Sequence, residues 1–297
     1  MPDEAYRFRD SRAAVERVLA KELFFIGGQP KSGTTWLQLL LDAHPDISCR
    51  GEGHFADQLA PPLREMLQLH SASLETKNKH VFAGMAPFPT FTEAHYTYLL
   101  VSAVALLLDA ACDPAAAVIG EKTPDNARYY GQLAALFPRA KFVHIVRDAR
   151  DCAVSAWFHN LRTNPEGVRA QFGTLAKFLP QYAQKWGAAT ALAASFGAAH
   201  PARFCQLRYE DLVAAPRATL TRLLEFLGVA ASARVADACV AAAGFETLSG
   251  GRAPGEEDRA SFFRRGEPGD WRRHLSEADN HAFLATCGAA MALYGYA

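Results

Sequence analysis

A glycine-bearing loop lies between an apolar run and a helical pattern near the start of the chain. The run "LFFI" ends at Ile26, the loop "GGQPKSGTTW" covers residues 27–36, and "LQLLLDAH" continues with helical spacing. In a strand–loop–helix unit the first amides of the helix have no partner within the helix, and the helix dipole favours negative charge there. The loop therefore predicts a binding site for a phosphate-like anion.

The rest of the chain alternates apolar runs of strand length with helical patterns. The runs "AAVIGEKT", "AKFVHIVRD" and "ARFCQLRYEDL" alternate with the helical stretches "YYGQLAALFP" and "ARDCAVSAWFHN". Continuous apolar strands between helices indicate a mostly parallel sheet that is covered on both faces. We therefore expect an α/β fold with a central sheet flanked by helices, in a single domain over residues 1–297. Residues 1–21 form an N-terminal helical extension in this scheme.

Charge and cysteine content argue against several classes of protein. The 31 basic and 31 acidic side chains cancel, so no overall field attracts nucleic acid or a membrane surface. Six scattered cysteines form neither a disulfide framework nor a zinc-type cluster.

The sequence also lacks the marks of a targeting or membrane segment. The N-terminus does not have the basic-then-apolar order of a signal peptide. The apolar stretch "YLLVSAVALLLDAAC" is shorter than a membrane-spanning helix, so we expect it to be a buried helix. We expect a cytoplasmic protein without nucleic-acid or membrane partners, and a homodimer remains open.

The lysine of the loop is not where nucleotide hydrolases place it. Gly28 and Gly33 keep the spacing of the GxxxxGK[ST] motif, in which lysine follows the second glycine and the hydroxyl holds magnesium. Here Thr34 follows Gly33, and the lysine is Lys31, inside the loop. The loop can still hold a phosphate-like group, with its cation on a different side. The plain alternative is a glycine turn with a solvated lysine.

A second anion-binding candidate follows a later apolar strand. In "IVRDARDCAVS", Arg147 stands at the end of the strand and Ser155 lies eight residues on, in the next helix. Ligands of α/β folds bind at the carboxyl ends of strands, and the arginine fork suits a phosphate. A surface salt bridge with Asp148 or Asp151 is the alternative for Arg147, and for Arg150 it is the better interpretation.

Four motifs together resemble those of the sulfotransferases that use 3′-phosphoadenosine 5′-phosphosulfate (PAPS). The stretch "PKSGTTW" resembles their 5′-phosphosulfate loop, and "VHIVRDARDCAVSAWFHN" resembles their 3′-phosphate strand and helix. "LRYEDLVAAPRATLTRLLEFLG" is similar to their nucleotide-side segment and "FFRRGEPGDWRRHLS" to their C-terminal loop. The motifs occur in the family's order between residues 23 and 275.

The resemblance implies a PAPS site that draws on most of the chain, with adenosine 3′,5′-bisphosphate (PAP) as product and no metal. Residues 246–274 would close over the nucleotide, although which of the two adjacent arginines points inward stays open. Core packing is the alternative for the aromatic residues. The implied residues are Lys31, Ser32, Gly33, Thr34 and Thr35 in the phosphosulfate loop; Trp36, Tyr209 and Phe245 on the nucleoside; and Arg147, Ser155, Arg264, Arg265 and Gly266 at the 3′-phosphate.

The general base is less clearly marked. Many soluble members have a histidine in a "KTH" motif, but the matching stretch here is "GEKTPDN", with Pro124 at the histidine position. The "EKTP" form resembles branches that modify tyrosine and glycosaminoglycans, whose catalytic glutamate lies in a segment like "DISCRGEGHF". This implies Glu52 as the base, and Lys122 as a contact of the transferring sulfuryl group. His54 is the competitor, on the same face as Glu52 if the segment stays extended.

The predicted reaction is in-line sulfuryl transfer from PAPS to a hydroxyl or amine of a small-molecule acceptor. Lys31 would stabilise the charge that develops on the leaving oxygen. The rivals are a magnesium-dependent nucleotide kinase, which predicts a lysine after Gly33, and a non-catalytic nucleotide-binding module. We expect residues 55–116 and 158–200 to shape the acceptor pocket. The aromatic residues of "KHVFAGMAPFPTF" would line that pocket or form core.

Overall fold

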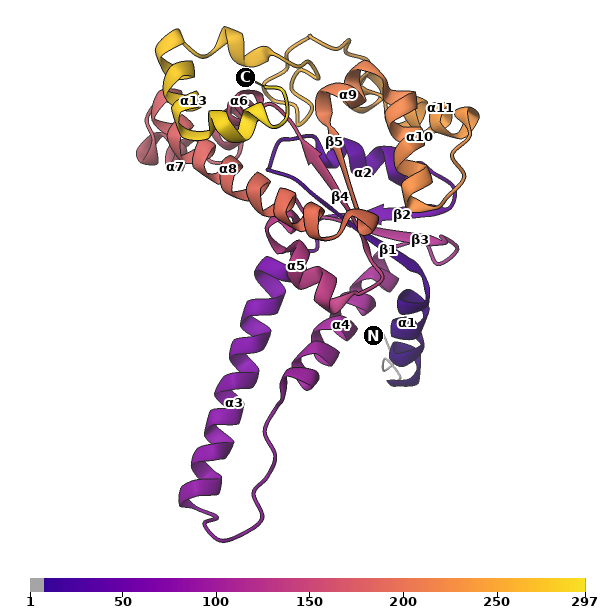
Figure 1. The fold of residues 1–297 in the computed structure, drawn as a ribbon, viewed down its shortest axis with the longest axis vertical. Coiled ribbons are helices and arrows are strands. Elements are labelled where there is room, and N and C mark those ends of the chain that lie inside the picture. Colours follow the sequence, from indigo (N-terminus) through magenta and orange to yellow (C-terminus); the bar gives the residue numbers. More distant parts are fainter. Residues whose placement is uncertain (1–7, 297) are drawn as a thin grey trace, which may run out of the picture.

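The structure is a computed structural model that describes residues 8–296. Its centre is a five-stranded sheet in the order β2–β3–β1–β4–β5, with every neighbouring pair parallel (Figure 1). This confirms the α/β class predicted from the alternating pattern. The strands are β1 (Glu22–Gly27), β2 (Ile47–Arg50), β3 (Val118–Lys122), β4 (Lys141–Val146) and β5 (Phe204–Arg208).

Helices cover both faces of the sheet, as expected for parallel strands. The α-helices are α1 (Phe8–Ala20), α2 (Thr34–Asp42), α3 (Ala60–His80), α4 (Glu93–Ala111), α5 (Asn126–Leu136), α6 (Ala149–Thr163), α7 (Pro165–Gln171), α8 (Leu175–Ala199), α9 (Tyr209–Ala214), α10 (Pro216–Leu227), α11 (Ala233–Ala242), α12 (Phe245–Ser249) and α13 (Glu277–Ala292). Shorter turns are the π-helical η1 (Phe55–Leu59) and the 3₁₀ turns η2 (Pro201–Arg203) and η3 (Asp270–Arg273).

Alternate side chains of the central strand β1 enter two different cores. Leu23 and Phe25 pack with residues of α4 and α5, whereas Phe24 and Ile26 pack with residues of α2 and α10. This division follows from the two-residue period of a strand. Burial of one such side chain contributes about 1.5–3 kcal/mol, so the apolar run "LFFI" ties both helical layers to the sheet.

A third core joins α6, α8 and α13 beside the carboxyl end of β4. It includes Trp157, Trp186 and Phe283. The indole of Trp186 also donates to the Arg147 carbonyl oxygen at 3.2 Å, one residue beyond β4. Because carboxyl ends of parallel strands share one edge, the loops after β1, β3 and β4 meet there, with α6 and α8 next to them.

α3, the connection over residues 81–92, and α4 form a helical arm, residues 60–111, most of which projects from the body of the molecule (Figure 1). The sequence predicted a buried helix for the apolar stretch in α4, and this is correct for one face only. Tyr96, Leu100 and Leu108 are buried, but Tyr98 is 64% exposed and Leu107 is 54% exposed. Among residues 8–296, α4 alone has the length and composition of a membrane-crossing helix.

Candidate functional site

The loop between β1 and α2 needs glycine at both of its spaced positions. A Cβ on Gly28 would lie 2.5 Å from the carbonyl oxygen of Ile145, and one on Gly33 would lie 2.6 Å from the Tyr209 ring. Gly33 also has φ of 100° where it precedes α2, which favours glycine. The spacing seen in the sequence is therefore a packing requirement of the neighbouring strand and helix.

The loop contains buried polar atoms without a partner. The Ser32 hydroxyl is fully buried and has no hydrogen-bond partner within residues 8–296, and the same holds for the Gln29 side-chain oxygen. The Ser32 amide closes a turn by donating to the Gln29 carbonyl oxygen at 3.0 Å. Buried polar groups normally find partners, so the loop has unused hydrogen-bonding capacity beside the N-terminus of α2.

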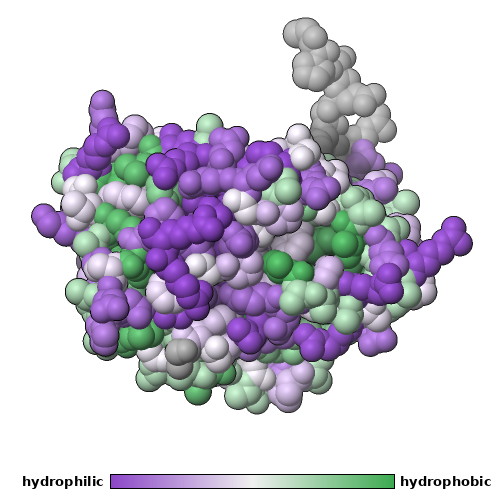
Figure 2. All heavy atoms as spheres, turned by 90° about the horizontal axis from the view of Figure 1, so that it is seen from above, coloured by the Kyte–Doolittle hydropathy of each residue, from purple (hydrophilic) through white to green (hydrophobic). Residues whose placement is uncertain are grey.

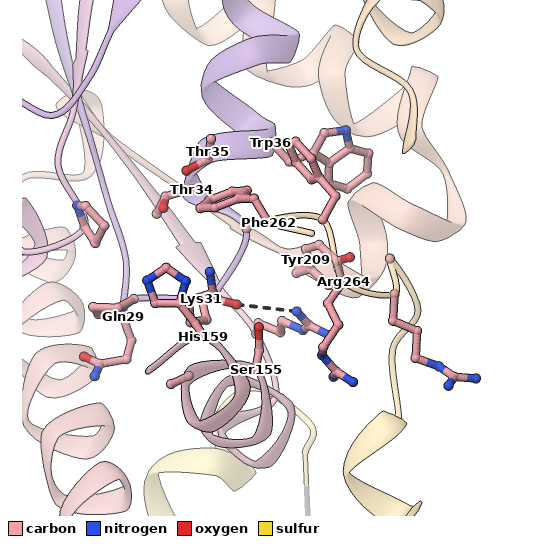
Figure 3. A pocket seen from close by; sticks show the side chains of 18 of the residues that line it. Gln29, Lys31, Thr34, Thr35, Trp36, Ser155, His159, Tyr209, Phe262 and Arg264 are labelled. Carbon is pink, nitrogen blue, oxygen red and sulfur yellow. Dashed lines mark hydrogen bonds between the residues drawn. The ribbon is translucent and has the colours of Figure 1, made fainter. Parts of the chain in front are cut away.

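The loop forms one wall of a cavity of about 620 Å³ that most of the predicted site residues line. Figure 3 shows Thr34 and Thr35 at the start of α2 on one side and Ser155 on α6 on another, with Lys31 between them. Ser32, Lys122 and His54 are not part of the lining. The predicted residues in the lining are Lys31, Gly33, Thr34, Thr35, Trp36, Glu52, Arg147, Ser155, Tyr209, Phe245, Arg264, Arg265 and Gly266.

Arg147 has a guanidinium group with weak partners only. Its Nη1 is 3.4 Å from the Lys31 carbonyl oxygen and its Nη2 is 3.3 Å from that of Glu267, while Nε is buried without a partner. The carboxylate of Asp151 is 3.7 Å from Nη2, and the guanidinium lies 4.2 Å from the centre of the Tyr209 ring. Such long hydrogen bonds are weak, so the group can bind an anion in the cavity.

The C-terminal loop brings two further arginines to the cavity. Arg264 pairs with Asp270 and with Glu257, the latter at 2.6 Å, and Arg265 pairs with Glu267 at 3.0 Å. Both arginines line the cavity, so the question of which one points inward has no single answer in this structure. An anion would compete with carboxylates for both guanidinium groups.

The same loop is fixed to α6 through its backbone. The buried carboxylate of Asp151 accepts from the Gly269 amide at 2.6 Å and from the Trp271 amide at 2.9 Å. Gly266 has φ of 69°, and a Cβ there would lie 2.3 Å from the Phe245 ring. Gly266 therefore allows the loop to pack directly on the aromatic side chain of Phe245.

Aromatic side chains meet where α2, α9 and α12 begin. The Trp36 indole donates to the Ala243 carbonyl oxygen at 2.8 Å, and its ring is edge-on to Tyr209 with centroids 5.6 Å apart. Tyr209 is only 6% exposed and packs against Gly33 and Arg147. Phe245 lines the same cavity. Tyr209 thus has a clear packing role, while Trp36 and Phe245 present partly exposed surface.

Glu52 is held between a lysine and a histidine. Its Oε1 is 2.5 Å from Lys122 Nζ and its Oε2 is 3.3 Å from His54 Nε2. Lys122 also donates to the Thr35 hydroxyl at 3.2 Å, which links Glu52 to the first turn of α2. Since Lys122 is 3% exposed and Glu52 lines the cavity, the carboxylate stands at the boundary between the buried cation and the open space.

Asp57 completes this cluster and was not predicted from the sequence. Its Oδ2 is 2.9 Å from His54 Nδ1. Burial opposes the charged form of His54, but the hydrogen bond to Asp57 and the charges of Asp57 and Glu52 raise its pKa above the ordinary value. The three-residue spacing of His54 and Asp57 was the available signal, since residues three apart face each other on a helical turn.

Glu52 and His54 were expected to share a face only if their segment stays extended, and in the structure it does not. β2 ends at Arg50, and His54 has φ of 48° where it precedes η1. The chain therefore turns between the two residues, and this turn brings the imidazole back to the carboxylate. The proximity was anticipated, but its cause is the turn and not the two-residue period of a strand.

Lys31 lies in a crowded cationic region of the cavity. Its ammonium nitrogen is 4.3 Å from the centre of the Phe262 ring. Burial lowers the pKa of Lys31 to about 8, and the positive charges of Arg162 and Arg147 act in the same direction. Burial also lowers the pKa of His159 to about 4, so His159 is neutral at physiological pH. Lys31 is therefore a cation that is poorly hydrated and close to its titration point.

The remaining wall of the cavity comes from α6, α8 and the segment after β3. Residues 158–200 contribute to the cavity as expected, whereas residues 55–116 contribute nothing to its lining. The aromatic residues of 79–91 neither line the cavity nor form core; Phe82 is 46% exposed and Phe88 is 70% exposed. The side chains of this wall are Pro124, Asp125, His159, Asn160, Phe178, Gln181, Tyr182 and Lys185.

Arg150 and Asp148 have structural roles. Arg150 pairs with Asp148 at 2.7 Å and lies 3.9 Å from the centre of the Trp271 ring. The predicted salt bridge is confirmed, although Arg150 is 5% exposed and the pair is buried and not on the surface. Asp148 also accepts from the Arg150 amide and caps α6. Its carboxylate is therefore already engaged by Arg150.

A model of the sulfotransferase family matches residues 24–233, the part of the chain that contains the phosphate loop, Glu52 and Arg147. The chain belongs to this family. Protein-tyrosine sulfotransferase 1 from Danio rerio is 30% identical over 211 residues, which are 70% of this chain and 53% of that protein. The chain thus spans about half the length of this curated relative.

Solved sulfotransferases share the fold at low identity. Mouse sulfotransferase SULT7A1 complexed with PAP has a TM-score of 0.54 and 18% identity, with 95% of this chain and 89% of that chain covered. Retinol dehydratase in complex with androsterone and inactive cofactor PAP has a TM-score of 0.51 and 16% identity, with 95% and 85% covered. The fold of this sulfotransferase is therefore shared with solved sulfotransferase structures.

Proposed function

We propose that this sulfotransferase transfers the sulfuryl group of PAPS to a hydroxyl or amine of a small-molecule acceptor, in the cytoplasm and without a metal. The observation that carries the proposal is the position of Glu52. This carboxylate is held by Lys122 and His54 on the wall of the cavity that the phosphate loop also lines. A base and an anion-binding loop on one cavity are what in-line transfer to a protonated nucleophile needs.

The chain's unused polar atoms support PAPS as the donor. Three buried polar atoms have no partner in the part of the chain that the structure describes: the Ser32 hydroxyl in the loop after β1, Arg147 Nε just after β4 and Arg264 Nε in the C-terminal loop. Three such groups from distant segments suit a ligand with two phosphate groups at separate ends. We assign the loop residues to the 5′-phosphate, Arg147, Ser155, Arg264, Arg265 and Gly266 to the 3′-phosphate, and Trp36, Tyr209 and Phe245 to the nucleoside. PAPS supplies an activated sulfuryl group.

The residues around Glu52 provide the proton chemistry. Glu52 accepts the proton as the acceptor O–H or N–H bond breaks, the new bond to sulfur forms, and the bond from sulfur to the 5′-phosphate oxygen breaks. His54, itself held by Asp57, fixes one carboxylate oxygen, and Lys122 fixes the other. Lys31 and Lys122 provide positive charge where negative charge increases during transfer.

The cavity wall of α6 and α8 supports a small acceptor with polar groups. Asp125, Asn160, Gln181 and Lys185 offer both donors and acceptors of hydrogen bonds. Phe178 adds an aromatic surface. One relative is named a protein-tyrosine sulfotransferase, and one solved structure of the same fold holds androsterone. We therefore take the side chains of this wall, and not the shared sheet, as the guide to the acceptor.

Nucleotide binding separates this proposal from the kinase rival. PAP is expected to raise the melting temperature, since a ligand at a hundred times its dissociation constant adds about 2.7 kcal/mol of stability. ADP or ATP with magnesium at equal concentration is expected to do much less, because neither carries a 3′-phosphate for Arg147. Differential scanning fluorimetry measures both. Stabilisation by magnesium nucleotides alone would contradict the proposal, and Arg147→Met should remove most of the response to PAP.

The lowered pKa of Lys31 predicts the alkaline limb of the pH profile. The group is charged below its pKa of about 8 and loses its charge as the pH rises through that value. We therefore expect kcat/KM for PAPS to fall tenfold per pH unit above about pH 8, since this parameter reports groups of the free enzyme. Lys31→Arg should move this limb to higher pH. An alkaline limb that stays in place in the variant would assign it to another group.

A further inference from the structure

The arm, residues 60–111, carries most of the large apolar side chains that are strongly exposed among residues 8–296. Of the 14 large apolar side chains that are strongly exposed among residues 8–296, ten lie on the arm. In α3 only Ala60 and Leu67 are buried, so no residue of the helix after Leu67 is buried. The ten are Met66, Leu69, Val81, Phe82, Met85, Phe88, Phe91, Tyr98, Leu99 and Leu107.

The end of the molecule farthest from the tip of the arm has a more hydrophilic surface. Seen from above, it presents hydrophilic side chains with apolar residues in separate groups between them (Figure 2). Scattered apolar residues of this kind are normal on a soluble protein, whereas a large apolar surface on one element marks an interaction site. The uncovered surface of the arm is therefore a local property and not a consequence of the overall composition.

The connection between α3 and α4 is fixed in place by polar contacts. Asn78 exchanges two hydrogen bonds with the backbone of Phe88, at 2.9 and 3.2 Å, and the Phe91 amide donates to the Ser71 hydroxyl at 3.1 Å. The backbone of this connection thus runs back along α3. Its apolar side chains nevertheless remain on the outside, with Phe88 70% and Met85 67% exposed.

The start of α4 is clamped to α3. Arg64 makes two hydrogen bonds of 2.7 and 2.6 Å to Glu93 and lies 3.9 Å from the centre of the Tyr96 ring. The Tyr96 hydroxyl donates to the Ala60 carbonyl oxygen at 3.2 Å. These contacts hold the two helices together where the arm leaves the body, so the arm presents its apolar side chains on a defined scaffold.

The size of the uncovered surface matches a protein interface. At roughly 100 Å² for each half-exposed large side chain, the ten together expose about 1,000 Å², which is of the order of the ~800 Å² that each partner buries in a standard interface. Helices in proteins owe most of their stability to the packing of an apolar face, and after Leu67 no residue of α3 is buried. Burial of the arm against a partner would supply the apolar packing that α3 lacks within its own chain.

The charge of the arm favours its own copy as the partner. Its three basic residues are Arg64, Lys77 and Lys79, and its acidic residues are Glu65, Glu75, Glu93 and Asp109. This near balance provides no excess of positive charge to attract an anionic membrane. Two identical arms can meet without strong repulsion, and a two-fold axis places the same surface on both sides of the interface.

We propose that the arm is a dimerisation element that packs against the arm of a second copy of this chain. In this dimer, Leu69 and Phe88 of one copy are buried against apolar side chains on the arm of the other copy. Helices α2, α6 and α8, which line the cavity, lie toward the other end of the molecule from the tip of the arm (Figure 1), and residues 60–111 contribute nothing to the lining. The proposal is therefore independent of the proposed reaction.

Size-exclusion chromatography with light scattering, over a series of protein concentrations, tests this inference. The wild type is expected to have twice the chain mass of 32.3 kDa, and the double variant Leu69→Glu, Phe88→Glu is expected to have half the wild-type value. Leu192→Glu is the matched control, because Leu192 is 53% exposed on α8, away from the arm. It should remain dimeric. Circular dichroism should show unchanged helix content in both variants.

Three outcomes would overturn the proposal. A wild type that is monomeric at every concentration would exclude a dimer of this kind. A double variant that stays dimeric would place the interface elsewhere. A monomeric wild type that binds vesicles of phosphatidylcholine and phosphatidylserine, while the double variant does not, would make the arm a lipid-binding element.

Discussion

Glu52→Gln is expected to lower kcat for sulfuryl transfer by about 10²- to 10⁴-fold, the usual contribution of a positioned general base. The amide keeps the size of the side chain but cannot accept the acceptor's proton. Lys122 and His54 hold the two carboxylate oxygens of the wild type, so the loss includes both basicity and orientation. Steady-state kinetics with PAPS and an acceptor found by screening would measure it.

Two controls separate the loss of the base from a general effect of the substitution. Glu166→Gln makes the same chemical change at an exposed position on α7 and should leave kcat unchanged. Stabilisation by PAP should persist in Glu52→Gln, since the cofactor loop is intact. Turnover close to that of the wild type in Glu52→Gln would show that another group takes the proton, with His54 next in line. Failure of the wild type to transfer sulfate to any acceptor would favour the non-catalytic module.

Lys31→Ala is expected to lower kcat by about 10²- to 10³-fold at saturating PAPS, because loss of one preorganised group that stabilises the transition state has an effect of this size. The Lys31 ammonium is largely desolvated, beside Phe262 and two arginines. A poorly hydrated cation interacts more strongly with developing negative charge than a hydrated one. Rapid-quench measurement of a single turnover would separate this chemical effect from PAP release.

The matched control for Lys31 is Lys177→Ala, on the exposed side of α8. That variant should retain wild-type kcat. Lys31→Arg should retain part of the activity, since the charge persists on a larger group. If Lys31→Ala changed only KM for PAPS, Lys31 would be a binding residue that contacts the ground state and the transition state equally.

The sheet and the phosphate loop were predictable because their causes are local. Strand-length apolar runs such as the one ending at Ile26 can be buried on both faces only in a covered parallel sheet. The positions of Gly28 and Gly33 are likewise visible in the sequence, although their reason, close contact with Ile145 and Tyr209, appears only in the structure. Local patterns carry the fold class and one end of the site.

The remaining features depend on contacts between distant segments. Tyr182 donates to the Pro30 carbonyl oxygen and Trp186 donates to that of Arg147, and nothing in "QYAQKW" marks either partner. The arm was misjudged for a similar reason. An apolar segment such as residues 81–91 was expected in a core or a pocket because a single sequence does not reveal whether a second chain covers it.

Neighbouring residues of α8 have different contacts, and this has a consequence for how the proposed acceptor preference could change. Tyr182 and Trp186 bind the helix to the loops after β1 and β4 through the carbonyl oxygens of Pro30 and Arg147. Gln181 and Lys185 lie one residue before each of them and face the cavity. Under the proposed function, substitutions at Gln181 and Lys185 should alter which compound is sulfated and leave the binding of the donor unchanged. This helix is the place where directed evolution for a new acceptor should begin.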